Sequence, residues 1–196
     1  TLVQVMQEEM PTGEALKSSL VTIENELEYL NLILSEIIKY SEPESGHQQV
    51  VSVDEVLQGI QVLLHTEAKL NDVKLVLHTK PGFYVFGTPQ GVKKIFFNLI
   101  FNAMQACQKK GGTVDIETSE EAGFVQVIVN DSGLGLPESE SGDIFEPYVT
   151  TKLDGVGLGL TIVKENLRSM QGTIEATNRP EGGAQFTVRM PKAEKE

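Results

Sequence analysis

The stretches N-D-S-G-L-G-L-P, at residues 130–137, and I-F-E-P-Y-V-T-T-K-L-D-G-V-G-L-G-L, at residues 144–160, decide how this chain is interpreted. Each contains closely spaced glycines, a polar loop separates them, and a helical pattern follows the second. Glycines at the start of a helix expose backbone N–H groups beside the positive end of the helix dipole. This arrangement is typical of a site for phosphate.

The first glycine cluster follows an expected strand. Residues 125–129 are β-branched at most positions, which is typical of a strand. Asp131 comes directly after them, and Gly133 and Gly135 follow where the backbone must turn tightly or touch a ligand. A carboxylate only accepts hydrogen bonds, so Asp131 would suit the amino group of a purine. Taken alone, these residues also fit a polar β-turn.

The second glycine cluster contains Gly155, Gly157 and Gly159 and precedes a predicted helix at Thr161–Met170. We expect an anion site at the start of this helix. The pattern G-x-G-x-G also describes dinucleotide-binding folds, but a strand leads directly into it there, and no strand is indicated here.

A third pattern lies upstream, in a predicted helix at Lys94–Gln108. This segment is apolar almost all round, so we expect it to be buried. Asn98 and Asn102 are four residues apart and therefore share one face of the helix. Amide oxygens are ligands that Mg²⁺ accepts, with phosphates and water completing its shell. The alternative is a pair of buried asparagines that bond to neighbouring backbone.

The patterns N-x-x-x-N, D-x-G-x-G, F-E-P-Y with T-T-K, G-x-G-L-G-L and a late G-G-A-x-F occur in this order at short spacings. Together they resemble the ATP-binding domain of sensor histidine kinases. That domain belongs to the superfamily shared with gyrase, the MutL mismatch-repair proteins and the pyruvate dehydrogenase kinases. The resemblance covers about residues 53–191 and implies ATP and Mg²⁺ as ligands.

The resemblance implies roles for individual residues at the base and metal. Asn102 corresponds to the Mg²⁺ ligand, and Asn98 to its catalytic partner one turn earlier. Asp131 corresponds to the carboxylate that recognises adenine. Gly133 and Gly135 correspond to backbone that passes beneath the nucleotide.

At the phosphate end, Lys152 stands where a basic residue of the lid would reach the terminal phosphate and take part in catalysis. The backbone that would meet the phosphates is that of Gly155, Gly157, Leu158, Gly159 and Leu160.

Some positions depart from the family pattern. Gln105 and Ala106 replace the Lys and Tyr that many relatives carry after the second asparagine. Ala184 stands where Thr or Ser is common. These changes leave the expected ATP affinity open. At the position of Asn98 the hydrolytic relatives have a Glu that activates water, so its absence favours phosphoryl transfer over hydrolysis.

Composition bounds the remaining possibilities. The 196 residues carry a formal net charge of −12, which makes a nucleic-acid backbone or an anionic membrane an unfavourable partner. The single cysteine, Cys107, is expected to be a small core residue. No run reaches transmembrane length and no signal peptide opens the sequence. We therefore expect a bacterial cytoplasmic polypeptide, and a membrane-anchored parent protein is compatible with this expectation.

Residues Glu14–Tyr40 carry apolar side chains at alternating spacings of four and three, which is a heptad seam. A seam on one helix cannot offset the entropy of ordering that helix, so it needs partners. We predict an antiparallel helical hairpin over residues 1–42 that dimerises into a four-helix bundle. The alternative is one amphipathic helix packed on its own domain.

In the resembling family this hairpin carries the phosphoacceptor histidine. None of the three histidines, His47, His65 and His78, has the expected acidic and basic helical neighbours. We therefore expect the acceptor to be absent from this chain, which then looks like a fragment that keeps the nucleotide domain.

The remaining pattern predicts an α/β (α+β) sandwich, with a mixed, mostly antiparallel sheet and three helices on one face. Residues 43–52 are the expected linker, Ser52 and Thr88 the expected helix caps, and residues 192–196 a frayed tail. Residues 136–156 form an expected lid that orders on nucleotide binding, with Phe145 and Tyr148 as anchors. Two strands, at 73–79 and 84–86, are predicted to pair around the turn at Pro81-Gly82.

The function implied is transfer of the ATP γ-phosphoryl group to a histidine on a dimeric helical bundle, and from there to an aspartate of a response regulator. A nucleotide-gated interaction module without kinase activity is the alternative from another class. A serine kinase or ATPase of the same superfamily is a third possibility, against which the heptad helix and Asn98 argue.

Overall fold

The computed structural model describes residues 47–107, 111–136, 144–149 and 157–195. The chain divides into two compact units, Thr1–Ser41 and Glu42–Glu196, and the described residues belong to the second. The hairpin predicted over residues 1–42 lies outside them. Within the described ranges, no helix is both long enough and apolar enough to cross a membrane.

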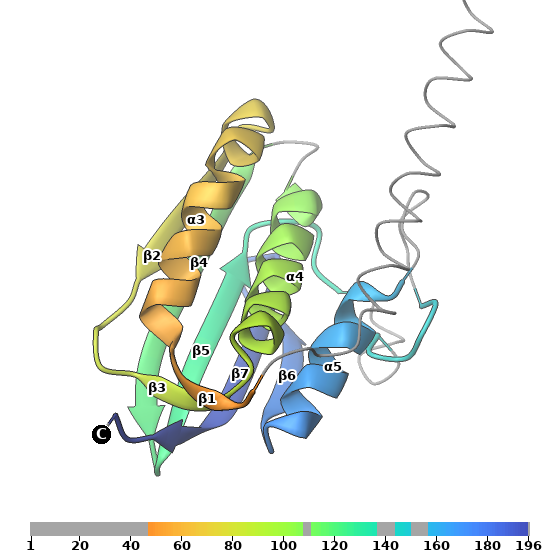
Figure 1. Cartoon of the computed structure of the whole chain (residues 1–196). Helices are drawn as coiled ribbons and strands as arrows, with labels where there is room; N and C mark the ends of the chain where they lie inside the picture. The colour runs from red at the N-terminus through yellow and green to blue at the C-terminus, as the bar shows by residue number, and fades with distance from the viewer. Residues whose placement is uncertain (1–46, 108–110, 137–143, 150–156, 196) are drawn as a thin grey trace, which may run out of the picture. The chain divides into compact units, whose positions relative to one another are not determined.

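The second unit is a two-layer sandwich, in which a seven-stranded sheet is covered on one face by helices (Figure 1). The predicted mixed, mostly antiparallel sheet with three helices is confirmed for the described residues. The helices are α3 (Val53–Leu70), α4 (Pro89–Cys107) and α5 (Gly159–Ser169). The strands are β1 (Gln49–Ser52), β2 (Val73–His78), β3 (Tyr84–Gly87), β4 (Gly112–Glu121), β5 (Phe124–Asp131), β6 (Thr173–Asn178) and β7 (Ala184–Ala193).

The sheet order is β1-β3-β7-β5-β4-β2, with β6 also paired to β7. Only β2 and β4 run parallel among the described strands. β7 is the strand that joins the sheet together. It pairs with β5 along one edge, and its other edge pairs first with β6 and then, at Lys192 and Ala193, with β3.

Two expectations about the sheet are wrong. The strands at 73–79 and 84–86 do not pair with each other, since β2 pairs with β4 and β3 pairs with β1 and β7. The expected linker over residues 43–52 contains β1, whose register with β3 aligns Val51 with Val85. Both of these valines are buried, and their burial accounts for a strand in a segment of polar composition.

The expected frayed tail at 192–196 is also partly wrong. Lys192 and Ala193 belong to β7, because they pair with Val85 and Tyr84. The Lys192 N–H also donates to the carbonyl oxygen of Gly123 at 2.9 Å. Backbone hydrogen bonds therefore order the chain beyond the last apolar residue of the strand.

The predicted caps of α3 and α4 are confirmed. The Ser52 hydroxyl accepts a hydrogen bond from the Glu55 N–H at 3.3 Å, and α3 begins one residue after it. The Thr88 hydroxyl accepts from the Gly91 N–H at 3.0 Å, and Pro89 is the first residue of α4. Side-chain oxygens thus satisfy donors that the first helical turn leaves unpaired.

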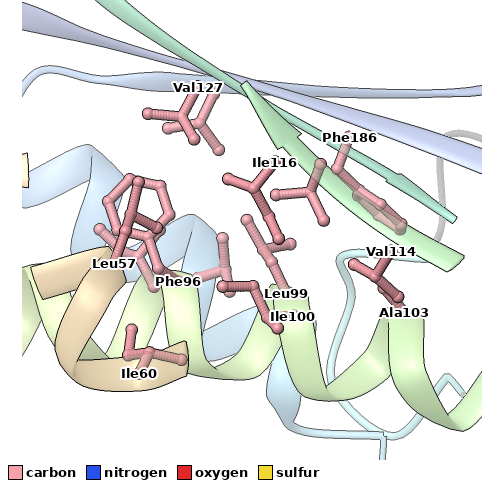
Figure 2. Packing of buried hydrophobic residues seen from close by; sticks show 14 of the residues in the cluster. Leu57, Ile60, Phe96, Leu99, Ile100, Ala103, Val114, Ile116, Val127 and Phe186 are labelled. Atoms are coloured by element: carbon pink, nitrogen blue, oxygen red, sulfur yellow. The ribbon is translucent and has the colours of Figure 1, made fainter. Parts of the chain in front are cut away.

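The core lies between α3, α4 and the sheet (Figure 2). Phe96, Leu99 and Ile100 of α4 are fully buried and face apolar side chains of the sheet such as Ile116. Each such side chain contributes about 1.5–3 kcal/mol through burial. Cys107 is buried with them, as expected. This packing fixes α4 rigidly on the sheet.

Asn166 of α5 is a buried polar side chain that the core does not satisfy. Its Nδ2 donates to the Ile162 carbonyl oxygen at 2.8 Å, but its Oδ1 has no hydrogen-bond partner among the described residues. A buried acceptor without a partner costs about 1–3 kcal/mol. The side chain is thus a local source of instability in α5.

We predict that Asn166→Leu, which is nearly isosteric, stabilises the domain by about 1 kcal/mol and raises Tm by about 2–4 °C. Thermal unfolding followed by circular dichroism measures this. Asn71→Leu is the matched control, and it should destabilise, because Asn71 Nδ2 donates to the Glu67 carbonyl oxygen at 2.9 Å. A lower Tm for Asn166→Leu would show that Oδ1 is not a net cost.

Candidate functional site

The site is built around one face of α4. Asn98, Asn102 and Ala106 follow each other at four-residue spacing, so they form a stripe along the helix. All three are half-buried, while the core residues of the same helix are fully buried. The Asn98 Nδ2 donates to the Lys94 carbonyl oxygen at 2.7 Å, which fixes the orientation of that amide. Other segments of the chain come close to α4 along this stripe through glycine residues, which have no side chain.

The second glycine cluster meets this stripe at the start of α5. A Cβ atom on Gly159, the first residue of α5, would lie 3.3 Å from Asn98 Oδ1 and 3.5 Å from Asn102 Nδ2. The structure therefore brings both asparagines to the N-terminus of a helix, as the anion-site interpretation requires. The residue before it, Leu158, provides no side-chain cap for the first N–H groups of α5.

Gly157 lies two residues before the start of α5. It has φ = +72°, a conformation that favours glycine, and its carbonyl oxygen accepts from the Tyr148 N–H at 3.1 Å. A Cβ atom there would lie 2.7 Å from the carbonyl carbon of Tyr148. The other residues expected at the phosphate end, Lys152 and Gly155, lie outside the described residues. Leu160 belongs to the first turn of α5.

The first glycine cluster meets the same stripe one turn further along. A Cβ atom on Gly133 would lie 2.6 Å from the Ala106 carbonyl oxygen and 2.7 Å from its Cβ. The loop after β5 therefore touches α4 at a distance that only glycine allows. Gly135 follows with φ = +77°, next to the Asn178 side chain.

Asp131 ends β5 and is buried, with 1% of its surface exposed. Its Oδ1 accepts two backbone hydrogen bonds, from the Gly133 N–H at 2.8 Å and the Ala184 N–H at 3.1 Å. Two donors from separate segments hold the carboxylate in one orientation. Both of these hydrogen bonds go to one oxygen, and a carboxylate has about four acceptor positions over its two oxygens.

Residues 178–181 support the backbone of the loop that begins at Asp131, and sequence reasoning missed them. Arg179 Nη1 donates to the Asp131 carbonyl oxygen at 2.8 Å, and its Nη2 donates to Glu181 Oε1 at 2.7 Å. That hydrogen bond lowers the pKa of the Glu181 carboxyl group below its usual value. The only sequence signal was the polar turn N-R-P-E-G-G, which does not indicate its tertiary partner.

Asn178 holds the other end of the same loop. Its Oδ1 accepts from the Leu136 N–H at 2.6 Å, and its Nδ2 donates to the Leu136 carbonyl oxygen at 2.9 Å. The loop from Asp131 to Leu136 is thus fixed at both ends by the turn between β6 and β7 and in the middle by α4.

Of the two residues predicted to anchor the lid, one is confirmed and the other is wrong. Phe145 is buried in the core, and its carbonyl oxygen accepts from the Thr161 hydroxyl at 3.2 Å, so this anchor is confirmed. Tyr148 is wrong as an anchor, because its side chain is 73% exposed. Its φ of +67° turns the backbone to meet Gly157 instead. An ion pair between Lys164 and Glu146, at 2.9 Å, adds a surface contact.

A family model described as "Histidine kinase-, DNA gyrase B-, and HSP90-like ATPase" matches residues 87–194. The chain belongs to this family. The matched range contains the α4 stripe, both glycine clusters and Asp131, so it includes the whole of the site described above. It leaves out α3, β1 and β2.

A curated relative and two solved structures extend the comparison. Sporulation kinase A of Bacillus subtilis (strain 168) is 33% identical over 184 residues, which cover 93% of this chain and 30% of the relative. The catalytic domain of histidine kinase ThkA has a TM-score of 0.68 at 26% identity over 74% of this chain and 96% of that one. ThkA in complex with the response regulator TrrA has a TM-score of 0.76 at 26% identity over 98% of this chain and 56% of that one.

We predict that Gly133→Ala destabilises the domain by about 1–3 kcal/mol, because its Cβ overlaps the backbone at Ala106. Urea unfolding measures the loss. Gly59→Ala is the matched control, since nothing lies within 4 Å of a Cβ at this helical position. The control should be about 0.5–1 kcal/mol more stable than the parent. Equal stability of the two variants would mean that the loop does not contact α4.

Proposed function

We propose that this domain binds ATP with Mg²⁺ and transfers the γ-phosphoryl group to a histidine on a helical bundle, as the catalytic part of a two-component histidine kinase. The observation that carries the proposal is the contact of Gly159 with both Asn98 and Asn102. It supports a metal–phosphate site, since two side-chain amides lie beside the start of a helix that has no side-chain cap. The relatives' names, a sporulation kinase and a histidine kinase bound to a response regulator, support the phosphotransfer class.

The residues present fit these ligands. Both side-chain amides lie close to Gly159 at the start of α5, where the dipole of the helix favours a phosphate. Asn102 would hold Mg²⁺, which when bound supplies charge neutralisation on the phosphate oxygens. Asn98 cannot act as a general base, because a side-chain amide is too weakly basic to take up a proton near neutral pH. That property favours transfer to a histidine over transfer to water.

At the other end of the nucleotide, Asp131 would accept a hydrogen bond from the adenine amino group. Ala184 and Gly133 orient the carboxylate through their N–H groups, so it needs no rearrangement on binding. Gly133 and Gly135 would lie beneath the base and ribose. Lys152 and Gly155 are proposed on the phosphate side, from the family resemblance.

We further propose that residues 1–42 belong to a helical hairpin that forms a homodimer, that a response regulator receives the phosphoryl group, and that the protein works in the bacterial cytoplasm. The complex of ThkA with TrrA supports the second of these partners. This chain spans 30% of Sporulation kinase A, so other parts of a longer protein would set the signal that is sensed.

Asp131→Asn should weaken ATP binding by about 100-fold with the fold intact, because an amide places a donor where the base also donates. Isothermal titration calorimetry with a non-hydrolysable ATP analogue measures this. Asp115→Asn is the matched control, since Asp115 pairs in register with Asn130 on the neighbouring strand. An unchanged affinity for Asp131→Asn would remove the carboxylate from its proposed role.

The whole chain with γ-labelled ATP should not label itself, yet it should label a separate helical bundle that carries an acceptor histidine. Transfer by Asn102→Ala should fall at least about 10-fold and lose its Mg²⁺ dependence. A bundle with His→Gln at the acceptor is the control. Acid-labile phosphate on His47, which is exposed at the start of the domain, would contradict the absence of an acceptor in this chain.

A further inference from the structure

β2 is the outer strand at one end of the sheet order. It pairs with β4 along one side, and none of the described strands pairs with its other side. Figure 1 shows β2 at the margin of the sheet, with α3 running beside it. An unpaired strand edge presents a row of backbone donors and acceptors to which another strand can be added. Soluble domains normally cover or shorten such an edge.

The register identifies the backbone groups that face outward. The Gly112 N–H donates to the Asp72 carbonyl oxygen at 3.2 Å, and Gly112 lies opposite Val73. Backbone groups of a strand alternate between its two sides, so residues 74, 76 and 78 point toward β4. Val73, Leu75 and Leu77 therefore direct their N–H and C=O groups away from the sheet.

The outward edge is only weakly covered. Gln61 Nε2, from α3, donates to the Leu75 carbonyl oxygen at 3.4 Å, which confirms that this carbonyl faces outward. At that length the hydrogen bond is weak. Within the described parts of the chain, no other side chain is recorded as bonding to the outward groups of β2. A glutamine side chain can rotate away at little cost and leave the edge open.

A groove of about 370 Å³ runs between α3 and the beginning of β2, along this edge. Two lysines line it from its two sides, Lys69 from α3 and Lys74 from β2, against the one carboxylate of Asp72, and His65 of α3 lies in the same lining. The whole chain has a formal net charge of −12, so a basic groove is a local exception.

We propose that this groove binds an extended acidic segment of a partner protein, which adds to β2 as a further strand. The outward groups of β2 would supply main-chain hydrogen bonds, and the basic side chains would select acidic residues. Side chains of an added strand alternate between the two faces, where Lys69 lies on the helix side and Lys74 on the other. None of the residues of the nucleotide site lines the groove, so the proposal is independent of the proposed function.

The test is an NMR titration of the whole ¹⁵N-labelled chain, without nucleotide, with capped peptides of about eight residues, the usual length of a strand. The binding peptide alternates Glu and Val. A second peptide replaces each Glu by Lys, and a third carries N-methyl groups at alternate residues, which removes the donors that pair with an edge. We expect the first peptide to shift resonances of residues 61–77 and the other two to bind at least about 10-fold more weakly.

Paired variants test the protein side. The double variant Lys69→Glu with Lys74→Glu should bind the Glu-Val peptide at least about 10-fold more weakly. Lys93→Glu, which reverses an exposed charge on α4, should bind it as the parent does. Circular dichroism verifies that each variant is folded.

Three outcomes would overturn the proposal. One is the absence of shifts at about 1 mM peptide, which excludes useful affinity. Another is equal binding of the Lys-Val or the N-methylated peptide, which excludes acidic recognition or strand addition. The third is a concentration-dependent shift of β2 without peptide, which would assign the edge to a second copy of the chain.

Discussion

The site depends on the close approach of bare backbone to one stripe of α4. Gly159 lies beside Asn98 and Asn102, and Gly133 meets Ala106 at a distance that a larger residue would not allow. α4 can serve as the reference surface because its other faces are fixed in the core by Phe96, Leu99 and Ile100. Buried apolar packing therefore sets the position of α4. Glycines in the loop after β5 and at the start of α5 then let these two segments come close to the helix.

This arrangement explains why two asparagines occur in so apolar a helix. A polar side chain in the core would cost free energy without partners. Asn98 and Asn102 avoid that cost because they lie on the half-buried face of α4 that is next to the start of α5. Asn166, one helix away, shows the opposite case, since its Oδ1 is buried without a partner. The free-energy cost of a polar residue on these helices thus depends on whether its polar atoms have hydrogen-bond partners.

Local patterns predicted the elements well, and distant pairings were harder to predict. The caps at Ser52 and Thr88 and the helical periodicity depend on residues within a few positions of each other, so the sequence contains all the necessary information. The partner of β3 depends on a strand about a hundred residues away, which no local pattern encodes. Arg179 was missed for the same reason, since its contact with Asp131 is created by the fold. The site glycines and asparagines could be predicted because the order and spacing of their short sequence patterns are visible in the sequence itself.

The position of β7 has a consequence for how the domain is made. Residues 184–193 lie between β5 on one side and β6 and β3 on the other, so the sheet has no continuous hydrogen-bond network without them. During synthesis the earlier strands leave the ribosome first. Until β7 arrives they remain in three parts, which are β1 with β3, β5 with β4 and β2, and β6 alone. The nascent chain must therefore keep exposed apolar strands apart until β7 has been made, a period in which chaperones protect such surfaces from aggregation.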